Sequence, residues 1–171
     1  MGTGGLFLRR LRAKVADAPS GFAWVVKGKV AASGFPSSRK QLEWLVAQGI
    51  DTILTLTPNP IPAEYLQGLP LTTEHMPMSD HGVPDLAVLD RGAEFVQKKV
   101  REGKTVLVHC LAGEGRTGCV LAAYMIKDRG LGAAEALETI RDVKPQFVEW
   151  EQEKAIFDYA AAQSHKRPSG Q

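Results

Sequence analysis

Cysteines and long apolar runs are both scarce in this 171-residue sequence. Its two cysteines, Cys110 and Cys119, are too few for a disulfide framework and lack the spacing of a zinc site. No apolar run approaches the roughly 18 residues of a membrane span, and the early segment LFLRRLRAKV carries charges among its apolar residues, unlike a signal peptide. We therefore expect no metal centre and no membrane segment.

An excess of charge of one sign is also lacking. The formal net charge is +2, with 44% hydrophobic and 23% charged residues. Such a small charge gives no argument for nucleic acid as a partner, and there is no basic, aromatic-rich stripe that would suit RNA. The composition is that of an ordinary globular protein, and the length predicts a single domain over residues 1–171.

Strand and helix patterns alternate along the first two thirds of the chain, and helical patterns follow. This order predicts an α/β fold, a single domain with a central, mostly parallel sheet of four to five strands flanked by helices on both faces. The expected strands are a pair within 22–32, then 51–57, 71–76 and 104–108. The expected helices are 5–16, with a basic face, 38–49, 63–67, 85–102, 117–128, 133–143 and 149–162. The domain core is expected at about 20–163, after an N-terminal extension at 1–19 and before a polar tail at 164–171.

The most informative stretch is KTVLVHCLAGEGRTG, residues 104–118. An apolar, β-branched run leads into a glycine-rich loop and then into a helix. The backbone N–H groups of such a loop, next to a helix N-terminus, form a nest that binds anions. The same field favours a thiolate, lowering a cysteine pKa from about 8.5 to between about 3.5 and 7.5. We therefore expect Cys110 to be a nucleophile and Arg116 to grip two phosphoryl oxygens at once.

Taken alone, Cys110 could be an inert buried thiol and Arg116 a charge at a helix start. The combination argues otherwise, because six such residues in register are expected by chance about once in 10⁸ windows. They are His109, Cys110, Gly113, Arg116, Thr117 and Gly118. HCLAGEGRTG resembles the signature loop of the cysteine-dependent protein tyrosine phosphatases, most of all that of the dual-specificity branch.

The resemblance covers about residues 20–163. The segments GFAWVVKGKVAASGFP, PMSDHGVPD, IKDRGLGAAEALETIR and VEWEQEKAIFDY are similar to small atypical dual-specificity phosphatases of the VH1-like member Z type and their archaeal relatives. The resemblance implies hydrolysis of phosphotyrosine, and of phosphoserine and phosphothreonine, in a protein or peptide through a cysteinyl-phosphate intermediate, without a cofactor. A catalytic thiolate needs a reducing compartment, so we expect a cytoplasmic protein. The expected phosphate-binding residues are Cys110, Leu111, Ala112, Gly113, Glu114, Gly115 and Arg116.

A thiolate that displaces a phosphate ester needs a general acid for the leaving oxygen. Asp80 is the candidate, because it lies in a loop after a strand, and a crossover helix could bring that strand beside the strand before Cys110. The resemblance implies an acid at the same place. Asp85 is the rival, although its position after Pro84 suits the start of a helix better. His81 could reach a substrate, but we expect it to be a solvated loop residue.

Four further residues near the motif carry predictions. The resemblance implies that Thr117 stabilises the sulfur as a leaving group, and that Gln152, near Glu149, orients the hydrolytic water. Both residues of that pair could equally lie on the surface of an amphipathic helix. We expect His109 to support the loop by hydrogen bonds. Cys119 is expected in the core, with a protective disulfide to oxidised Cys110 as the competing hypothesis.

Leu111 and Glu114 depart from the lysines that phosphatases of polyphosphoinositides carry around this loop. A carboxylate there should repel a multiply phosphorylated ring, so phosphoinositides are a less favoured substrate. RNA 5′ ends and sugar phosphates are further substrate classes that the same loop could bind. The competing hypothesis of another class is a catalytically weak module that binds phosphorylated groups. The presence of Cys110, Arg116 and Asp80 argues against it.

Overall fold

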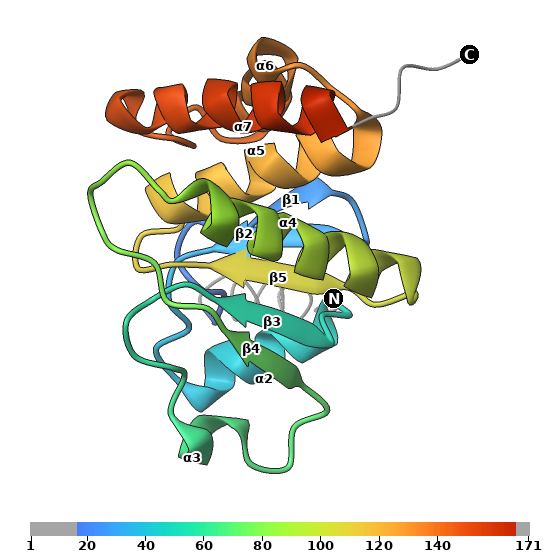
Figure 1. Ribbon diagram of the computed structural model, residues 1–171. Helices are drawn as coiled ribbons and strands as arrows, with labels where there is room; N and C mark the ends of the chain where they lie inside the picture. Colours follow the sequence, from blue (N-terminus) through green and yellow to red (C-terminus); the bar gives the residue numbers. More distant parts are fainter. Residues whose placement is uncertain (1–16, 167–171) are drawn as a thin grey trace, which may run out of the picture.

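The computed structural model describes residues 17–166, which form a five-stranded sheet between two layers of helices (Figure 1). The strands are β1 (Ala23–Val26), β2 (Val30–Ser33), β3 (Thr52–Thr55), β4 (Thr72–His75) and β5 (Val106–His109). The order across the sheet is β1-β2-β5-β3-β4, with β1 antiparallel to β2 and the other neighbours parallel. The predicted α/β fold with a mostly parallel sheet is confirmed.

The strands end in register at one edge of the sheet. His109 of β5 lies opposite Ser33 of β2 on one side and opposite Thr55 of β3 on the other. Thr55 in turn lies opposite His75 of β4. The loops that follow β2, β3, β4 and β5 therefore leave from the same edge, where ligands bind in parallel α/β sheets.

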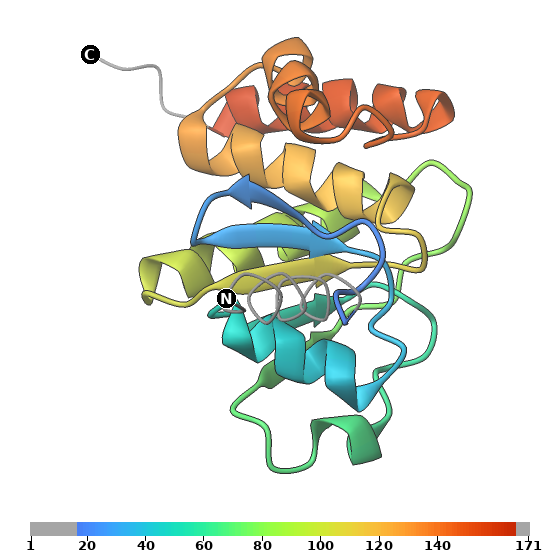
Figure 2. The ribbon, with the colours of Figure 1, turned by 180° about the vertical axis from the view of Figure 1, so that it is seen from behind.

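Helices cover both faces of the sheet, as Figures 1 and 2 show from opposite sides. The smaller layer is α2 (Arg39–Ala47) with α3 (Ala63–Leu66), and the thicker one is α4 (Leu86–Arg101), α5 (Gly115–Arg129), α6 (Ala133–Val143) and α7 (Glu153–Lys166). In β5, Val106 and Val108 belong to the larger core with α4 and α5, whereas Leu107 between them belongs to the smaller core with α2. Burial on both faces explains why β5 reads as a continuous apolar run.

Helix α5 is the central helix of the thicker layer, and its residues Gly115 to Ile126 are all buried. It begins at Gly115 rather than at the predicted residue 117, so Arg116 and Thr117 lie in its first turn. It ends at Gly130, whose φ of 72° is a left-handed C-cap. The observed start places the arginine and the threonine on rigid helical backbone.

The C-terminal helix differs from its predicted bounds at both ends. A short 3-10 turn, η1 (Trp150–Gln152), precedes α7, because Glu149 and Gln152 form a capping box that gives this segment its own turn. Helix α7 continues to Lys166, so residues 164–166 are helical and the predicted tail from 164 starts too early. The predicted helix at 5–16 and residues 167–171 lie outside the part of the chain that the structure describes.

Candidate active site

The loop between β5 and α5 together with the first two residues of α5, residues 110–116, is called the phosphate loop here. Its Cys110 is 3% exposed and forms part of the wall of a cavity of about 170 Å³. The remaining wall comes from the segment after β4 and from the residue before η1, so three distant parts of the sequence meet at this cavity. The residues around it are Asp80, His81, Cys110, Leu111, Ala112, Glu114, Gly115, Arg116 and Glu149.

The Cys110 thiol has a pKa below its ordinary value. Burial alone would raise this pKa, but the Thr117 side chain and the backbone N–H groups of Thr117, Glu114 and Gly113 stabilise the thiolate and outweigh burial. The Gly113 N–H lies 3.2 Å from Sγ. The Thr117 hydroxyl is buried and makes no hydrogen bond of standard geometry to any residue in 17–166, which leaves it free to turn toward the sulfur.

Close backbone packing fixes the shape of the phosphate loop. Gly113 has a φ of 73°, and a Cβ there would lie 2.4 Å from the carbonyl carbon and oxygen of Ser33 at the end of β2. No side chain fits at that distance. The Lys144 ammonium donates to the Gly113 carbonyl at 3.1 Å and lies 3.6 Å from Glu114 Oε1. The loop is therefore held both by backbone contact with β2 and by a lysine side chain.

Arg116 has a buried guanidinium in which one nitrogen, Nε, has no partner among the described residues. Its Nη2 lies 3.1 Å from Asp80 Oδ1, and its Nη1 donates to the Met78 carbonyl at 3.4 Å. The side chain is only 4% exposed. A buried donor without a partner is costly, and a phosphate oxygen in the cavity would satisfy it.

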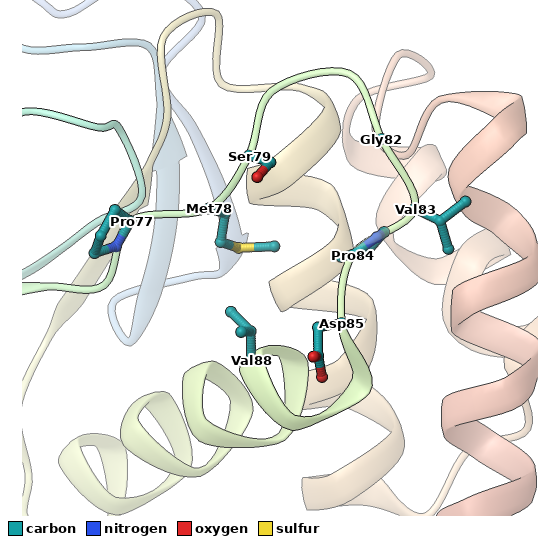
Figure 3. Close-up of a pocket in the computed structure, with 8 residues that line it drawn as sticks. All are labelled: Pro77, Met78, Ser79, Gly82, Val83, Pro84, Asp85 and Val88. Carbon is teal, nitrogen blue, oxygen red and sulfur yellow. The ribbon is translucent and has the colours of Figure 1, made fainter.

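The structure separates the two candidate acids. Asp80 lines the cavity with Cys110, and its half-exposed carboxylate is paired with Arg116. Asp85 instead caps α4, accepting a hydrogen bond from the Ala87 N–H at 2.7 Å, and lines a different cavity (Figure 3). Of the two carboxylates, Asp80 is the one placed to reach a group bound above Cys110.

The two histidines near the site differ in environment. His109 is fully buried, and its Nδ1–H donates to the Cys110 carbonyl at 3.1 Å while Nε2 accepts from the Thr55 hydroxyl at 2.9 Å. Burial lowers the pKa of His109 to about 4, so it is a neutral support of the loop. The prediction of a solvated loop residue is confirmed for His81, whose ring is exposed. The ring also lies between two carboxylates, 3.6 Å from Asp80 Oδ2 and 3.5 Å from Glu149 Oε2.

Gln152 lies behind the phosphate loop and does not line the cavity. It is 2% exposed, so the alternative of a surface position is wrong for it, and the role of orienting the hydrolytic water stays a prediction. Its Oε1 accepts from the Glu149 N–H at 3.0 Å, and its Nε2 donates to the Gly82 carbonyl at 3.4 Å. Glu149 is the residue of this pair that faces the cavity, a position that its sequence context did not reveal.

A match to a known family accounts for this arrangement. Residues 19–162 match the family described as "PTP-SAK: Swiss Army Knife protein, DSP-PTPase phosphatase domain". The chain belongs to this family. The match covers most of the sequence, and it includes the phosphate loop, Asp80 and Gln152.

Curated relatives agree with this family of phosphatase domains. The chain is 33% identical to the dual specificity protein phosphatase Mpk3 of Drosophila melanogaster over 104 residues, which are 60% of this chain and 25% of that protein. It is 26% identical to phosphatidylglycerophosphate phosphatase PTPMT2 of Arabidopsis thaliana over 131 residues, 74% of this chain and 58% of that protein. The chain thus spans between a quarter and about three fifths of these two relatives.

Solved structures show the same fold. Tk-PTP in its active form is 28% identical, with a TM-score of 0.73 over 83% of this chain and 97% of that one. PTPMT1 in complex with PI(5)P superposes with a TM-score of 0.73 over 85% of this chain and 97% of that one. It is 19% identical, so this likeness concerns the fold alone.

The second cysteine of this phosphatase domain has the opposite electrostatic environment. Cys119 is fully buried, and its thiol donates to Gln152 Oε1 at 3.5 Å. Burial raises the pKa of Cys119 to about 12, with smaller contributions from the charges of Glu149 and Cys110. It therefore stays a neutral thiol in the core, as expected from its place on the helix behind the loop.

A second, more open cavity of about 340 Å³ adjoins the first and was not predicted from the sequence. The walls of both cavities include Asp80, Leu111 and Arg116. If the phosphate group of a ligand binds at Arg116, the rest of the ligand would therefore lie beside the second cavity. The prolines at 57–62 signalled only a loop, and nothing in the sequence showed that this loop faces the site. The residues around the second cavity are Phe35, Thr57, Pro58, Asn59, Asp80, Leu111 and Arg116.

Residues 17–166 contain neither a candidate membrane-spanning helix nor a candidate metal site. Within 17–166, no helix is both long enough and apolar enough to cross a lipid bilayer. The same residues contain no cluster of three or more histidine, cysteine, aspartate or glutamate side chains arranged to hold a metal ion.

Proposed function

We propose that the chain hydrolyses phosphotyrosine, and also phosphoserine and phosphothreonine, in proteins or peptides through a covalent phosphocysteine. The observation that carries the proposal is the Cys110 thiol, which lies at the wall of a cavity that also presents Arg116. The Thr117 side chain, together with the backbone N–H groups of Thr117, Glu114 and Gly113, lowers the pKa of this thiol. A thiolate, a nest of N–H donors and a guanidinium together suit attack on phosphorus. The second cavity, which shares Asp80, Leu111 and Arg116 with the first, is where the part of the substrate beyond the phosphate would lie.

In the first step, Cys110 Sγ attacks phosphorus, the S–P bond forms and the bond to the leaving oxygen breaks. The three remaining phosphoryl oxygens are held by loop N–H groups and by the Arg116 guanidinium, including its free Nε. Asp80 gives its proton to the leaving oxygen, which departs as an alcohol or phenol. The phosphate takes over the Nη2 donor that Asp80 Oδ1 holds at 3.1 Å, which frees the Asp80 carboxyl to face the leaving oxygen.

In the second step, water attacks the phosphocysteine and the S–P bond breaks. Asp80, now a carboxylate, accepts a proton from the water, and inorganic phosphate leaves. The sulfur departs as a thiolate, which the Thr117 hydroxyl and the loop N–H groups stabilise as they do in the free site. Neither step needs a metal ion, and Gln152 contributes by holding Glu149 and the Gly82 carbonyl in place.

Lipid phosphomonoesters are the second candidate substrate class. The similarity to a phosphatidylglycerophosphate phosphatase over 74% of this chain favours them, as does Leu111, an apolar side chain 62% exposed at the rim of the site. Glu114 at the same rim argues against substrates with several phosphates. Given the thiolate mechanism, we place the activity in a reducing compartment such as the cytoplasm.

A turnover panel with a chelator present tests the proposal. The substrates are phosphotyrosine and phosphoserine peptides, phosphatidylglycerophosphate in detergent, a polyphosphoinositide and triphosphorylated RNA. We expect the phosphopeptides to be turned over fastest, with activity retained in chelator, lost in Cys110→Ser and unchanged in the matched variant Cys119→Ser. A strict need for a divalent metal would refute the mechanism, and a lipid turned over faster than both peptides would replace the substrate class.

A further inference from the structure

The segment that carries Asp80, residues 77–85, is called the acid loop here, and it has a hollow underside. Figure 3 shows this loop arching over a cavity, with Met78 and Val88 facing the space below. The cavity measures about 240 Å³. Met78 packs into the core, but no side chain fills this space, so packing from beneath does not set the height of the loop at residues 80–82.

The position of the acid loop is set instead by three successive residues at its crest. Asp80 pairs with Arg116, and the Gly82 carbonyl accepts from Gln152 Nε2. Between them, the His81 ring reaches Asp80 on one side and Glu149 on the other. The contacts of His81 and Gly82 tie the loop to the segment around η1.

The His81 ring has the geometry of a bridge. Nε2 lies 3.6 Å from Asp80 Oδ2, and Nδ1 lies 3.5 Å from Glu149 Oε2. A ring with one proton can donate to one of these oxygens, whereas an imidazolium can donate to both. The remaining charged or titratable groups around the same cavity are Cys110, Glu114 and Arg116.

The backbone is in an uncommon positive-φ conformation at or next to both ends of this bridge. His81 has a φ of 49° and Val148, just before Glu149, has a φ of 63°; these are the non-glycine residues with positive φ in the described chain. Such a conformation is a genuine outlier for a β-branched valine and is retained only where surrounding contacts impose it. Arg141 imposes it on the second segment by donating to the Phe147 and Val148 carbonyls at 2.9 and 2.8 Å.

We propose that His81 is a positioning residue that holds Asp80 over Cys110 by tying the acid loop to Glu149. The inference rests on the proposed function, because it concerns the acid of that reaction. When phosphate binds, it takes Arg116 from Asp80 Oδ1, so the contact on Oδ2 is the one that remains. Without His81, the Asp80 carboxyl, which lies above the cavity, can move away from the leaving oxygen. Even a small displacement lowers the rate of proton transfer.

The test compares leaving groups in His81→Asn. Asparagine, like histidine, tolerates positive φ, so this variant removes the bridge while keeping the backbone. We expect kcat for phenyl phosphate, a poor leaving group, to fall about tenfold, with nitrophenyl phosphate losing less than about threefold and KM changing less than about twofold. Glu149→Gln should show the same pattern from the other end, and exposed Glu151→Gln on the same turn should leave both rates unchanged.

The decisive variant combines His81→Asn with Asp80→Asn. In this background His81→Asn should cause no further loss of kcat with either substrate. Equal losses for both leaving groups, no loss at all, or an additional loss in the Asp80→Asn background would overturn the inference while leaving the proposed function intact. Absence of turnover by the unmodified chain in the same assay would refute the proposed function, and this inference with it.

Discussion

The phosphate loop and the acid loop meet at the contact between Arg116 and Asp80, but they are held in opposite ways. The phosphate loop is packed so closely that a Cβ at Gly113 would lie 2.4 Å from the Ser33 backbone. The acid loop is largely exposed, lies above a cavity, and would accept a Cβ at Gly82 with no atom within 4 Å. In the proposed mechanism, charge stabilisation thus depends on closely packed backbone, and proton transfer depends on a segment held by a few side-chain contacts.

The contrast has a kinetic consequence. Damage to the phosphate loop should slow every substrate, because the phosphoryl group is the same in all of them. Damage to the acid loop should slow substrates in proportion to how much their leaving oxygen needs a proton. Substitutions in the two loops test this difference. The expected loss of kcat decreases from Arg116 through Asp80 to the glycines, and the two cysteines are compared by alkylation.

Among the substitutions that leave the Cys110 nucleophile in place, Arg116→Lys should have the largest effect. A lysine is a point charge and cannot reproduce the two-pronged grip of the guanidinium, so kcat should fall about 10²-fold to 10³-fold. The loss should be the same for phenyl and nitrophenyl phosphate, measured at saturating substrate. A rate within about threefold of the parent, under about 1 kcal/mol of barrier, would show that the fork is not required.

Asp80→Asn should lower kcat by about 10²-fold or more for poor leaving groups and by much less for nitrophenyl phosphate. Its pH profile should keep the acidic limb and lose the basic limb, which reports the protonated acid. Asp85→Asn is the matched control on the same loop. Because Asp85 caps α4, its loss should cost about 0.3 to 1 kcal/mol in thermal unfolding and leave the profile unchanged. The reverse pattern would make Asp85 the acid.

Gly113→Ala and Gly82→Ala compare the packing of the two loops directly. At Gly113 the φ of 73° and the Ser33 backbone both exclude a methyl group, so the phosphate loop must shift and kcat should fall by up to about 10²-fold. At Gly82 the methyl meets open space, and the rate should stay within about twofold. Similar losses in the two variants would contradict the difference in rigidity.

The two cysteines should differ in alkylation rather than in stability. The lowered pKa of Cys110 means that its thiolate persists as pH falls below the ordinary thiol range, so iodoacetamide should label it at neutral pH and bound phosphate should protect it. Cys119, with a pKa of about 12 and no exposed surface, should stay unlabelled in the folded chain. Peptide mapping after a timed reaction separates the two, and comparable labelling of Cys119 would contradict the assignment.

Much of the fold could be predicted because local signals agreed with tertiary structure. The apolar run before Cys110 became β5, and the Pro84–Asp85 signal became the capped start of α4. The bridge around His81 could not be predicted, since no sequence rule places a valine such as Val148 at positive φ. Long-range packing fixes that turn, and with it the inward Glu149 and the buried Gln152.

The central claim is that Cys110 carries the phosphoryl group during turnover. Rapid acid quenching of the chain during turnover of an aryl phosphate, followed by peptide mapping and mass measurement, tests it most directly. We predict one phosphoryl group on the peptide that contains Cys110, absent in Cys110→Ser and retained in Cys119→Ser. A phosphoryl group on any other residue, or continued turnover by Cys110→Ser, would contradict the account.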